Sequence, residues 1–237
     1  MRLVQRPNRY LILFDLDGTL YSFRGGSYRR SALRRRVRLN AGRFLMNRLG
    51  VTLARARRIL GDIERTYGED VSIGVERRFS INRREYFRAV WNIPARGYVT
   101  VSPNLRRTIQ HIRRQFDVAV LSDAPSIWVH RVLRTLRIAD LFRGRTFTGE
   151  GDDRKSFGNA FQRLIVRHHL NPRRCIVVGD QARTDIIPAR AAGMQTILLS
   201  RHRRSTRGDE NIRTIGELES ALEHLTSTVR TPRTSHS

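Results

Sequence analysis

Four short, continuous apolar runs are the feature that most limits how this chain can fold. They span residues 10–14, 118–121, 175–178 and 196–199. Runs of this length without polar alternation are typical of parallel strands that are buried on both faces. Apolar residues at helical spacing lie between them, at 105–116, 129–136 and 157–165. This alternation predicts an α/β fold in which a parallel sheet is covered by helices on both faces.

Residues 27–91 interrupt the alternation, because they contain no convincing strand. Apolar residues follow helical spacing at 33–45, 53–67 and 83–91, and a proline follows at position 94. We therefore expect a helical insert with hinges at residues 25–26 and 94–97. The predicted boundaries are a core of residues 1–22 and 98–225, an insert of residues 23–97, and a Ser/Thr-rich disordered tail of residues 226–237.

The charge is unusual in size and in kind. The chain has 237 residues and a net charge of +25, and Lys155 is its only lysine. Such a charge attracts nucleic acid and other polyanions without specificity. The arginines are spread along the whole length, which also fits a compositional bias of the source genome. A group in the insert is expected to form a solvated face, of which some members could guide an anionic substrate: Arg29, Arg30, Arg34, Arg35, Arg36 and Arg38.

Cysteine usage and hydropathy limit the compartment. Cys175 is the single cysteine, so the chain can form neither an internal disulfide nor a cysteine metal cluster. No apolar run approaches the length of a membrane span. The N-terminus carries arginines without a long apolar region, so we expect a cytoplasmic protein that makes no membrane contact.

Polar side chains follow three of the predicted strands. Asp15 and Asp17 come after the first, Ser122 after the second, and Asp180 and Asp185 after the third. The carboxyl ends of neighbouring parallel strands face one crevice, where ligands bind. A single aspartate at a strand end can equally be the N-cap of the next helix, but three such ends favour a site. Crowded carboxylates need a hard cation between them, and Mg²⁺ prefers oxygen ligands.

This inventory suits phosphoryl transfer through an aspartate. Asp15 is the candidate nucleophile, and Asp17 the acid that protonates the leaving oxygen and later the base for water. Lys155 can place a compact charge beside Asp15, where a broad guanidinium would fit poorly. We expect it on an exposed loop at 149–156. The candidate metal ligands are Asp15, Asp17, Asp180 and Asp185, and the candidate phosphate-binding residues are Gly18, Ser122, Asp123 and Lys155.

These residues, in this order, resemble the haloacid dehalogenase superfamily of aspartate-dependent phosphatases. Its four signatures correspond to Asp15-Leu-Asp-Gly-Thr-Leu, Ser122, Lys155, and Gly179-Asp180 with Asp185. The resemblance covers about residues 10–200, and Ser156 stands where the family usually has proline. It implies a Rossmann-like, doubly wound parallel sheet with an inserted α-helical cap.

Weaker features resemble the pyrimidine 5′-nucleotidase branch of that superfamily. They are Leu20-Tyr21, Tyr67-Gly68, Ser122-Asp123-Ala124, His130-x-Val132-Leu133 and Ile138-x-Asp140-x-Phe142, with Asp123 where that branch usually has asparagine. The resemblance implies a magnesium-dependent phosphomonoester hydrolase that forms an aspartyl phosphate, acting on a small phosphorylated metabolite, first a nucleoside monophosphate. The alternatives are a sugar-phosphate or phosphoglycolate phosphatase, and a basic nucleic-acid-binding protein with a secondary phosphatase core.

Overall fold

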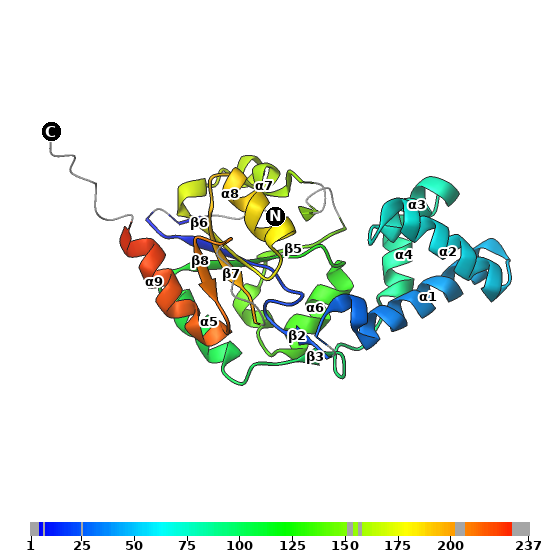
Figure 1. Ribbon diagram of the computed structural model, residues 1–237, viewed down its shortest axis with the longest axis horizontal. Helices are drawn as coiled ribbons and strands as arrows, with labels where there is room; N and C mark the ends of the chain where they lie inside the picture. The colour runs from blue at the N-terminus through cyan, green and yellow to red at the C-terminus, as the bar shows by residue number, and fades with distance from the viewer. Residues whose placement is uncertain are drawn as a thin grey trace.

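A six-stranded parallel sheet forms the centre of the molecule (Figure 1). The computed structural model describes residues 5, 6, 8–24, 26–150, 154, 155, 158–201 and 207–228. The strands follow the order β5-β4-β1-β6-β7-β8. Their bounds are β1 Leu11–Phe14, β4 Asp117–Leu121, β5 Thr146–Phe147, β6 Cys175–Gly179, β7 Gln195–Leu199 and β8 Glu210–Ile212. The α/β, Rossmann-like doubly wound fold is confirmed, and the four predicted strands are β1, β4, β6 and β7.

Helices cover both faces of this sheet. The helices α5 Leu105–Gln115, α6 Ser126–Thr135 and α9 Leu218–Thr228 pack with Ile12 and Phe14, while α7 Ala160–His168 and α8 Ile187–Ala191 pack with Leu11 and Leu13. Successive strand residues point to opposite faces, so each strand supplies apolar side chains to both layers. The shorter helices are η1 Tyr28–Arg30, η2 Ala139–Phe142, η4 Pro172–Arg174, η5 Ala182–Ile186 and η6 Ile215–Glu217.

The register of the three central strands brings their carboxyl ends to one level. Phe14, the last residue of β1, lies opposite Val120 of β4 and Val178 of β6. The backbone N–H of Asp15 donates to the carbonyl oxygen of Val178 at 2.9 Å. The segments that leave these three strands therefore start side by side, at one edge of the sheet.

A helical insert follows β1 and lies to one side of the sheet in Figure 1. It contains α1 Ala32–Leu49, α2 Leu53–Tyr67, α3 Val71–Phe79 and α4 Arg83–Val90. A two-stranded antiparallel ribbon, β2 Ser22–Phe23 with β3 Val99–Thr100, joins its two ends. This ribbon lies where the sequence predicted the boundaries at residues 22–23 and 97–98. Helix α3 was not predicted, because it is short and carries Gly74 in its interior.

The predicted start of the disordered tail changes. Helix α9 runs to Thr228, so the prediction that the disordered tail begins at residue 226 is wrong for residues 226–228. The rest of that tail, residues 229–237, lies outside the described residues, as do Gly25 of the predicted hinge and Ser156. Among the described residues, no helix combines the length and the apolarity that crossing a membrane requires.

An aromatic chain connects the insert to the core. The ring centroids of Tyr21 and Phe23 lie 5.1 Å apart, and those of Phe23 and Tyr28 lie 5.8 Å apart. Tyr28 stacks on Trp91 at 6.3 Å, and Trp91 lies 6.0 Å from Trp128 of α6. Aromatic pairs at such distances contribute about 0.5–1.5 kcal/mol each beyond the area that they bury. The hinge of the insert is therefore a packed junction that continues the apolar core.

Helix α3 packs so closely on α2 that only glycine fits at position 74. A Cβ atom there would overlap Ile63 and Tyr67. Gly74→Ala should therefore destabilise the protein by about 1–3 kcal/mol, through overpacking. Gly61→Ala is the matched control, since Gly61 lies inside α2 where a Cβ atom would make only an ordinary contact with Arg65, and alanine there should stabilise by about 1 kcal/mol. Denaturant unfolding of both variants checks this, and equal stabilities would contradict the close packing.

Candidate active site

Three buried or partly buried carboxylates meet where β1 and β6 end. Asp15 follows β1, Asp180 follows β6, and Asp185 lies in η5. Each can offer one oxygen such that the three oxygens lie within 4.8 Å of one another. An all-oxygen set of this kind suits a hard cation, and Mg²⁺ is commonly held by one or two carboxylates with waters completing its shell. The sequence predicted these three aspartates as metal ligands, and the structure brings them together.

Two glycines allow these carboxylates to approach the backbone. Gly18 has a φ of +101°, and a Cβ atom there would overlap the Asp180 carboxylate. A Cβ atom on Gly179 would overlap Asp185. Glycine is therefore required at both positions, at Gly18 for its conformation and at both for space.

Lys155 bridges the carboxylates. Its Nζ donates to Oδ1 of Asp15 at 2.6 Å and to Oδ1 of Asp185 at 2.6 Å. Its side chain is only 5% exposed, so the expectation of an exposed loop is wrong at this residue. Burial opposes the charge of the ammonium, but Asp15 and Asp185 outweigh burial and hold the pKa of Lys155 well above its ordinary value. The positive charge of Lys155, which offsets the charge of the carboxylates, is thus held between Asp15 and Asp185.

Asp123 holds the segment that carries Lys155. Its Oδ1 accepts the backbone N–H of Lys155 at 2.6 Å. The phosphate contact expected for Asp123 stays a prediction, and in the structure its carboxylate holds the backbone of Lys155. Ser122, the preceding residue, lies at the end of β4 as expected and donates to Oδ2 of Asp17 at 3.0 Å.

Asp17 is held apart from the carboxylate cluster by three donors. Tyr21 Oη and Trp128 Nε1, the latter at 3.0 Å, donate to its Oδ1, and Ser122 donates to its Oδ2. Burial raises the pKa of Asp17, and these hydrogen bonds oppose that rise. Both oxygens are engaged, and the Asp17 side chain does not join the three possible metal ligands, although the sequence predicted it as a fourth.

Two further contacts at the site were missed from the sequence. Thr19 Oγ1 donates to Oδ2 of Asp15 at 3.0 Å. Arg201, beyond β7, donates to the carbonyl oxygens of Gly18 and Thr19, the latter at 3.1 Å. Thr19 lies in the first motif and its spacing from Asp15 was a usable signal, whereas no local pattern marks Arg201. Together they fix the backbone loop after Asp15.

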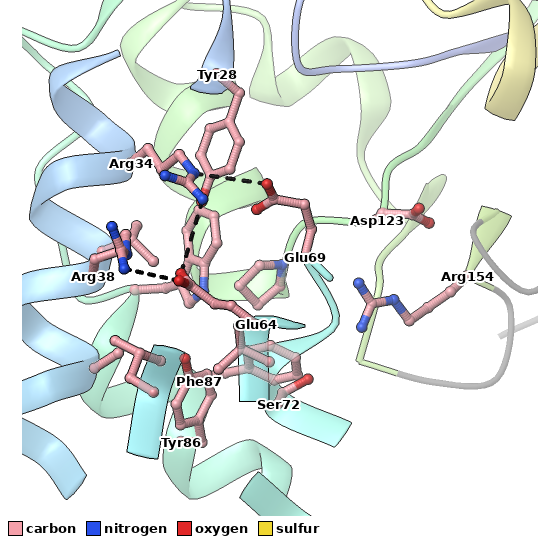
Figure 2. Close-up of a pocket in the computed structure, with 16 residues that line it drawn as sticks. Tyr28, Arg34, Arg38, Glu64, Glu69, Ser72, Tyr86, Phe87, Asp123 and Arg154 are labelled. Carbon is pink, nitrogen blue, oxygen red and sulfur yellow. Dashed lines mark ion pairs between the residues drawn. The ribbon is translucent and has the colours of Figure 1, made fainter. Parts of the chain in front are cut away.

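A small cavity lies between the insert and the core, beside this site. Its volume is about 60 Å³, and Figure 2 shows Asp123 and Arg154 on its core side, with the Arg154 guanidinium pointing toward the insert. On the insert side, Arg38 pairs with Glu64 at 2.8 Å, and Arg34 lies 3.9 Å from Glu64 and 3.7 Å from Glu69. Arg34 and Arg38 were expected on a solvated face, but they line the cavity.

An ion pair joins the insert to the core beside this cavity. Arg154, which is buried and precedes Lys155, pairs with Asp70 at the start of α3. A pair this poorly exposed is screened less than a surface pair, so it fixes the insert against the core more firmly. The insert therefore contacts the segment that carries Lys155.

The crowded carboxylates make the stability of the metal-free protein depend on pH. Burial and the neighbouring Asp185 raise the pKa of Asp180 from 3.8 to about 7. The folded state thus retains a proton that the unfolded state has lost, and stability falls as pH rises between these two values. The thermal midpoint of chelator-treated protein should be lower at about pH 8 than at about pH 5, and Mg²⁺ should restore it most at the higher pH.

Asp180→Asn removes the titrating group and a proposed metal ligand. It should weaken both the pH dependence and the Mg²⁺ response, each measured by thermal unfolding. Asp62→Asn, at an exposed site on α2, is the matched control and should leave both unchanged. An undiminished Mg²⁺ response in Asp180→Asn would place the metal elsewhere.

Comparison with known proteins agrees with this geometry. Residues 11–193 match the family model of the haloacid dehalogenase-like hydrolases. A phosphoglycolate phosphatase from Vibrio vulnificus is 26% identical over 196 residues, which cover 77% of this chain and 80% of the relative. A phosphatase structure from Thermococcus onnurineus superposes with a TM-score of 0.63 at 22% identity and covers 90% of this chain and 97% of its own. A haloacid dehalogenase-like hydrolase structure from Xanthomonas campestris gives 0.59 at 18% identity and covers 96% and 97%. With the family model matching most of its length, the chain belongs to the haloacid dehalogenase-like hydrolases.

Proposed function

We propose that this protein is a magnesium-dependent phosphomonoester hydrolase that forms an aspartyl phosphate on Asp15. The observation that carries the proposal is the position of Lys155 Nζ, at 2.6 Å from both Asp15 and Asp185, with Asp180 in the same cluster. A fixed ammonium beside a carboxylate nucleophile can offset the negative charge of an incoming phosphate. The family match and the phosphatase relatives support this chemistry.

The side chains divide the work between nucleophile and proton carrier. Asp15 attacks phosphorus and forms a P–O bond as the bond to the leaving oxygen breaks, and Asp17 gives that oxygen its proton. Asp17 then takes a proton from water, which attacks the phosphorus of the aspartyl phosphate and releases inorganic phosphate. Ser122 orients Asp17 through their hydrogen bond. Asp15, Asp180 and Asp185 would hold a Mg²⁺ ion, which would neutralise charge at the phosphate.

We propose a compact, acidic phosphomonoester as the substrate, with phosphoglycolate as the leading candidate. The cavity beside the site has a volume of only about 60 Å³, whereas pockets that bind drug-sized ligands have volumes of roughly 300–1,000 Å³. A nucleoside would require the insert to move away from the core and break the Arg154–Asp70 pair. Arg34, Arg38 and Arg154 line the cavity, and each already pairs with a carboxylate, so a second anionic group of the substrate would have to replace that carboxylate as the partner of one of them. The phosphoglycolate phosphatase relatives favour the same alternative over the nucleotidase.

Turnover of a panel of phosphomonoesters tests both parts of the proposal. With Mg²⁺, kcat/KM should be higher for phosphoglycolate than for uridine or cytidine 5′-monophosphate. Asp15→Asn should remove nearly all turnover, because an amide is a poor nucleophile. Wild-type rates in Asp15→Asn would reject the aspartyl phosphate. Faster hydrolysis of the nucleotides would reject only the substrate.

The only lysine should resist replacement by arginine. The Lys155 ammonium fits between two buried carboxylates, and a planar guanidinium is broader and places its charge differently. Lys155→Arg should lower kcat/KM about a hundredfold or more, on the order of 3 kcal/mol of transition-state stabilisation.

Two measurements accompany this variant. Circular dichroism establishes that Lys155→Arg is folded, and Lys155→Met reports the loss of charge at a similar side-chain length. If turnover in Lys155→Arg matched the wild type while Lys155→Met was inactive, positive charge alone would suffice and the requirement for a compact ammonium would be rejected.

A further inference from the structure

The insert carries a disproportionate share of the positive charge. Residues 23–97 contain 19 arginines and six acidic residues, whereas the net charge of the whole chain is +25. About half of the net charge therefore lies in less than a third of the chain.

Five arginines of the insert line an open groove between α1 and α4. The groove consists of two adjoining hollows of about 510 and 700 Å³, which share Phe44, Glu85 and Ala89. Its arginines come from both helices and are Arg36, Arg43 and Arg48 of α1 and Arg84 and Arg88 of α4. Phe44 is partly buried and lines both hollows.

This arginine groove is separate from the cavity beside the active site. On α1 the groove is lined at positions 36, 40, 43, 44, 47 and 48, whereas the cavity is lined at positions 34, 37, 38 and 41, so the two share no residue of this helix. At 3.6 residues per turn, positions 36, 40, 43 and 47 lie on a different face of the helix from the cavity residues. A ligand in the groove would therefore not occupy the cavity.

Ion pairing distinguishes the two faces. On the cavity side, Arg34 and Arg38 pair with Glu64 and Glu69. In the groove, Arg48 pairs with Glu85 at 3.3 Å. The other four, Arg36, Arg43, Arg84 and Arg88, are exposed and form no ion pair with any carboxylate of the described residues. The groove thus presents uncompensated guanidinium groups, which are suited to phosphate.

The spacing of these groups indicates an extended ligand. Arg36 and Arg43 are two turns apart, about 10 Å along the axis of α1, so one phosphate group cannot engage both. Successive phosphates of a polynucleotide strand can engage both arginines. A strand can also enter the groove, whereas a flat membrane surface would not reach the groove floor. Phe44 offers a partly exposed ring, and basic grooves with an aromatic floor are typical of single-strand binding.

We propose that the arginine groove of the insert binds single-stranded nucleic acid through its phosphate backbone, without sequence preference. The binding is independent of the hydrolase reaction, since the groove contains no residue of the catalytic cluster. Four to five phosphate contacts would give a slope of about −3 in a plot of log affinity against log salt. Affinity should then fall roughly a hundredfold between about 50 and 200 mM salt.

The test is a pair of charge-reversed variants with the same change in net charge. Arg36→Glu with Arg43→Glu alters the groove, and Arg107→Glu with Arg114→Glu alters two exposed arginines at the same spacing on α5, on the core. Binding of a fluorescent single-stranded RNA oligonucleotide by the full chain is followed by anisotropy. The groove variant should bind at least about tenfold more weakly, with a salt slope reduced by about 1.4, while the α5 variant should stay within twofold of the wild type.

Turnover of a small phosphomonoester by both variants establishes that each is folded, since neither pair touches the catalytic cluster. Equal losses in the two variants would overturn the proposal, because they would assign the attraction to the net charge as a whole. Unchanged binding in the groove variant, or equal affinity for a duplex of the same length, would also overturn it.

Discussion

The contact of Lys155 with Asp15 and Asp185 is the interaction on which the site depends. Carboxylates this close repel one another, and burial raises the pKa of Asp15 well above its ordinary value, a rise to which Asp185 and Asp180 add. Without a cation among them, the buried carboxylates would take up protons and Asp15 would lose its nucleophilic form. Lys155 supplies a fixed part of the compensation, and a bound metal ion would supply the remainder. The rest of the site serves to keep these charges at contact distance.

This requirement explains features that look unrelated in the sequence. Gly18 and Gly179 have no side chain because Asp180 and Asp185 occupy that space. The chain uses arginine at nearly every basic position, yet the buried position between Asp15 and Asp185 holds lysine. Arginine serves well on a surface, where its fork can spread, but not in a gap that fits one ammonium.

The sequence predicted the elements whose signal is local. The four central strands were visible as apolar runs, and because adjacent parallel strands end together, the motif residues after them were expected to meet. Strands β5 and β8, of two and three residues, are too short to leave such a signal. Helix α3 was not predicted, because it is short and Gly74 in its interior weakens the helical pattern. Arg201, about 180 residues from the carbonyl oxygens that it contacts, could not be found from any spacing, because only the fold brings it there.

Lys155 and Arg154 are buried, although the sequence predicted an exposed loop at these residues. The insert contributes to this burial. A segment of charged residues is typical of an exposed loop, but the insert covers Arg154, which pairs with Asp70. Sequence patterns report the amphipathicity of one element at a time, whereas burial here results from two separate parts of the chain closing on each other. The same limit applies to Arg34 and Arg38, whose glutamate partners lie on α2 and beyond it.

The insert also contacts the core through the residues that hold Asp17. Tyr21 and Trp128 donate to this carboxylate, and both belong to the aromatic chain that runs through Phe23, Tyr28 and Trp91 into the insert. A rotation of the insert about its ribbon would have to shift these rings, because closely packed side chains transmit displacement. The donors to Asp17 would then shift with them. The position of the proposed proton carrier is therefore linked physically to the position of the insert.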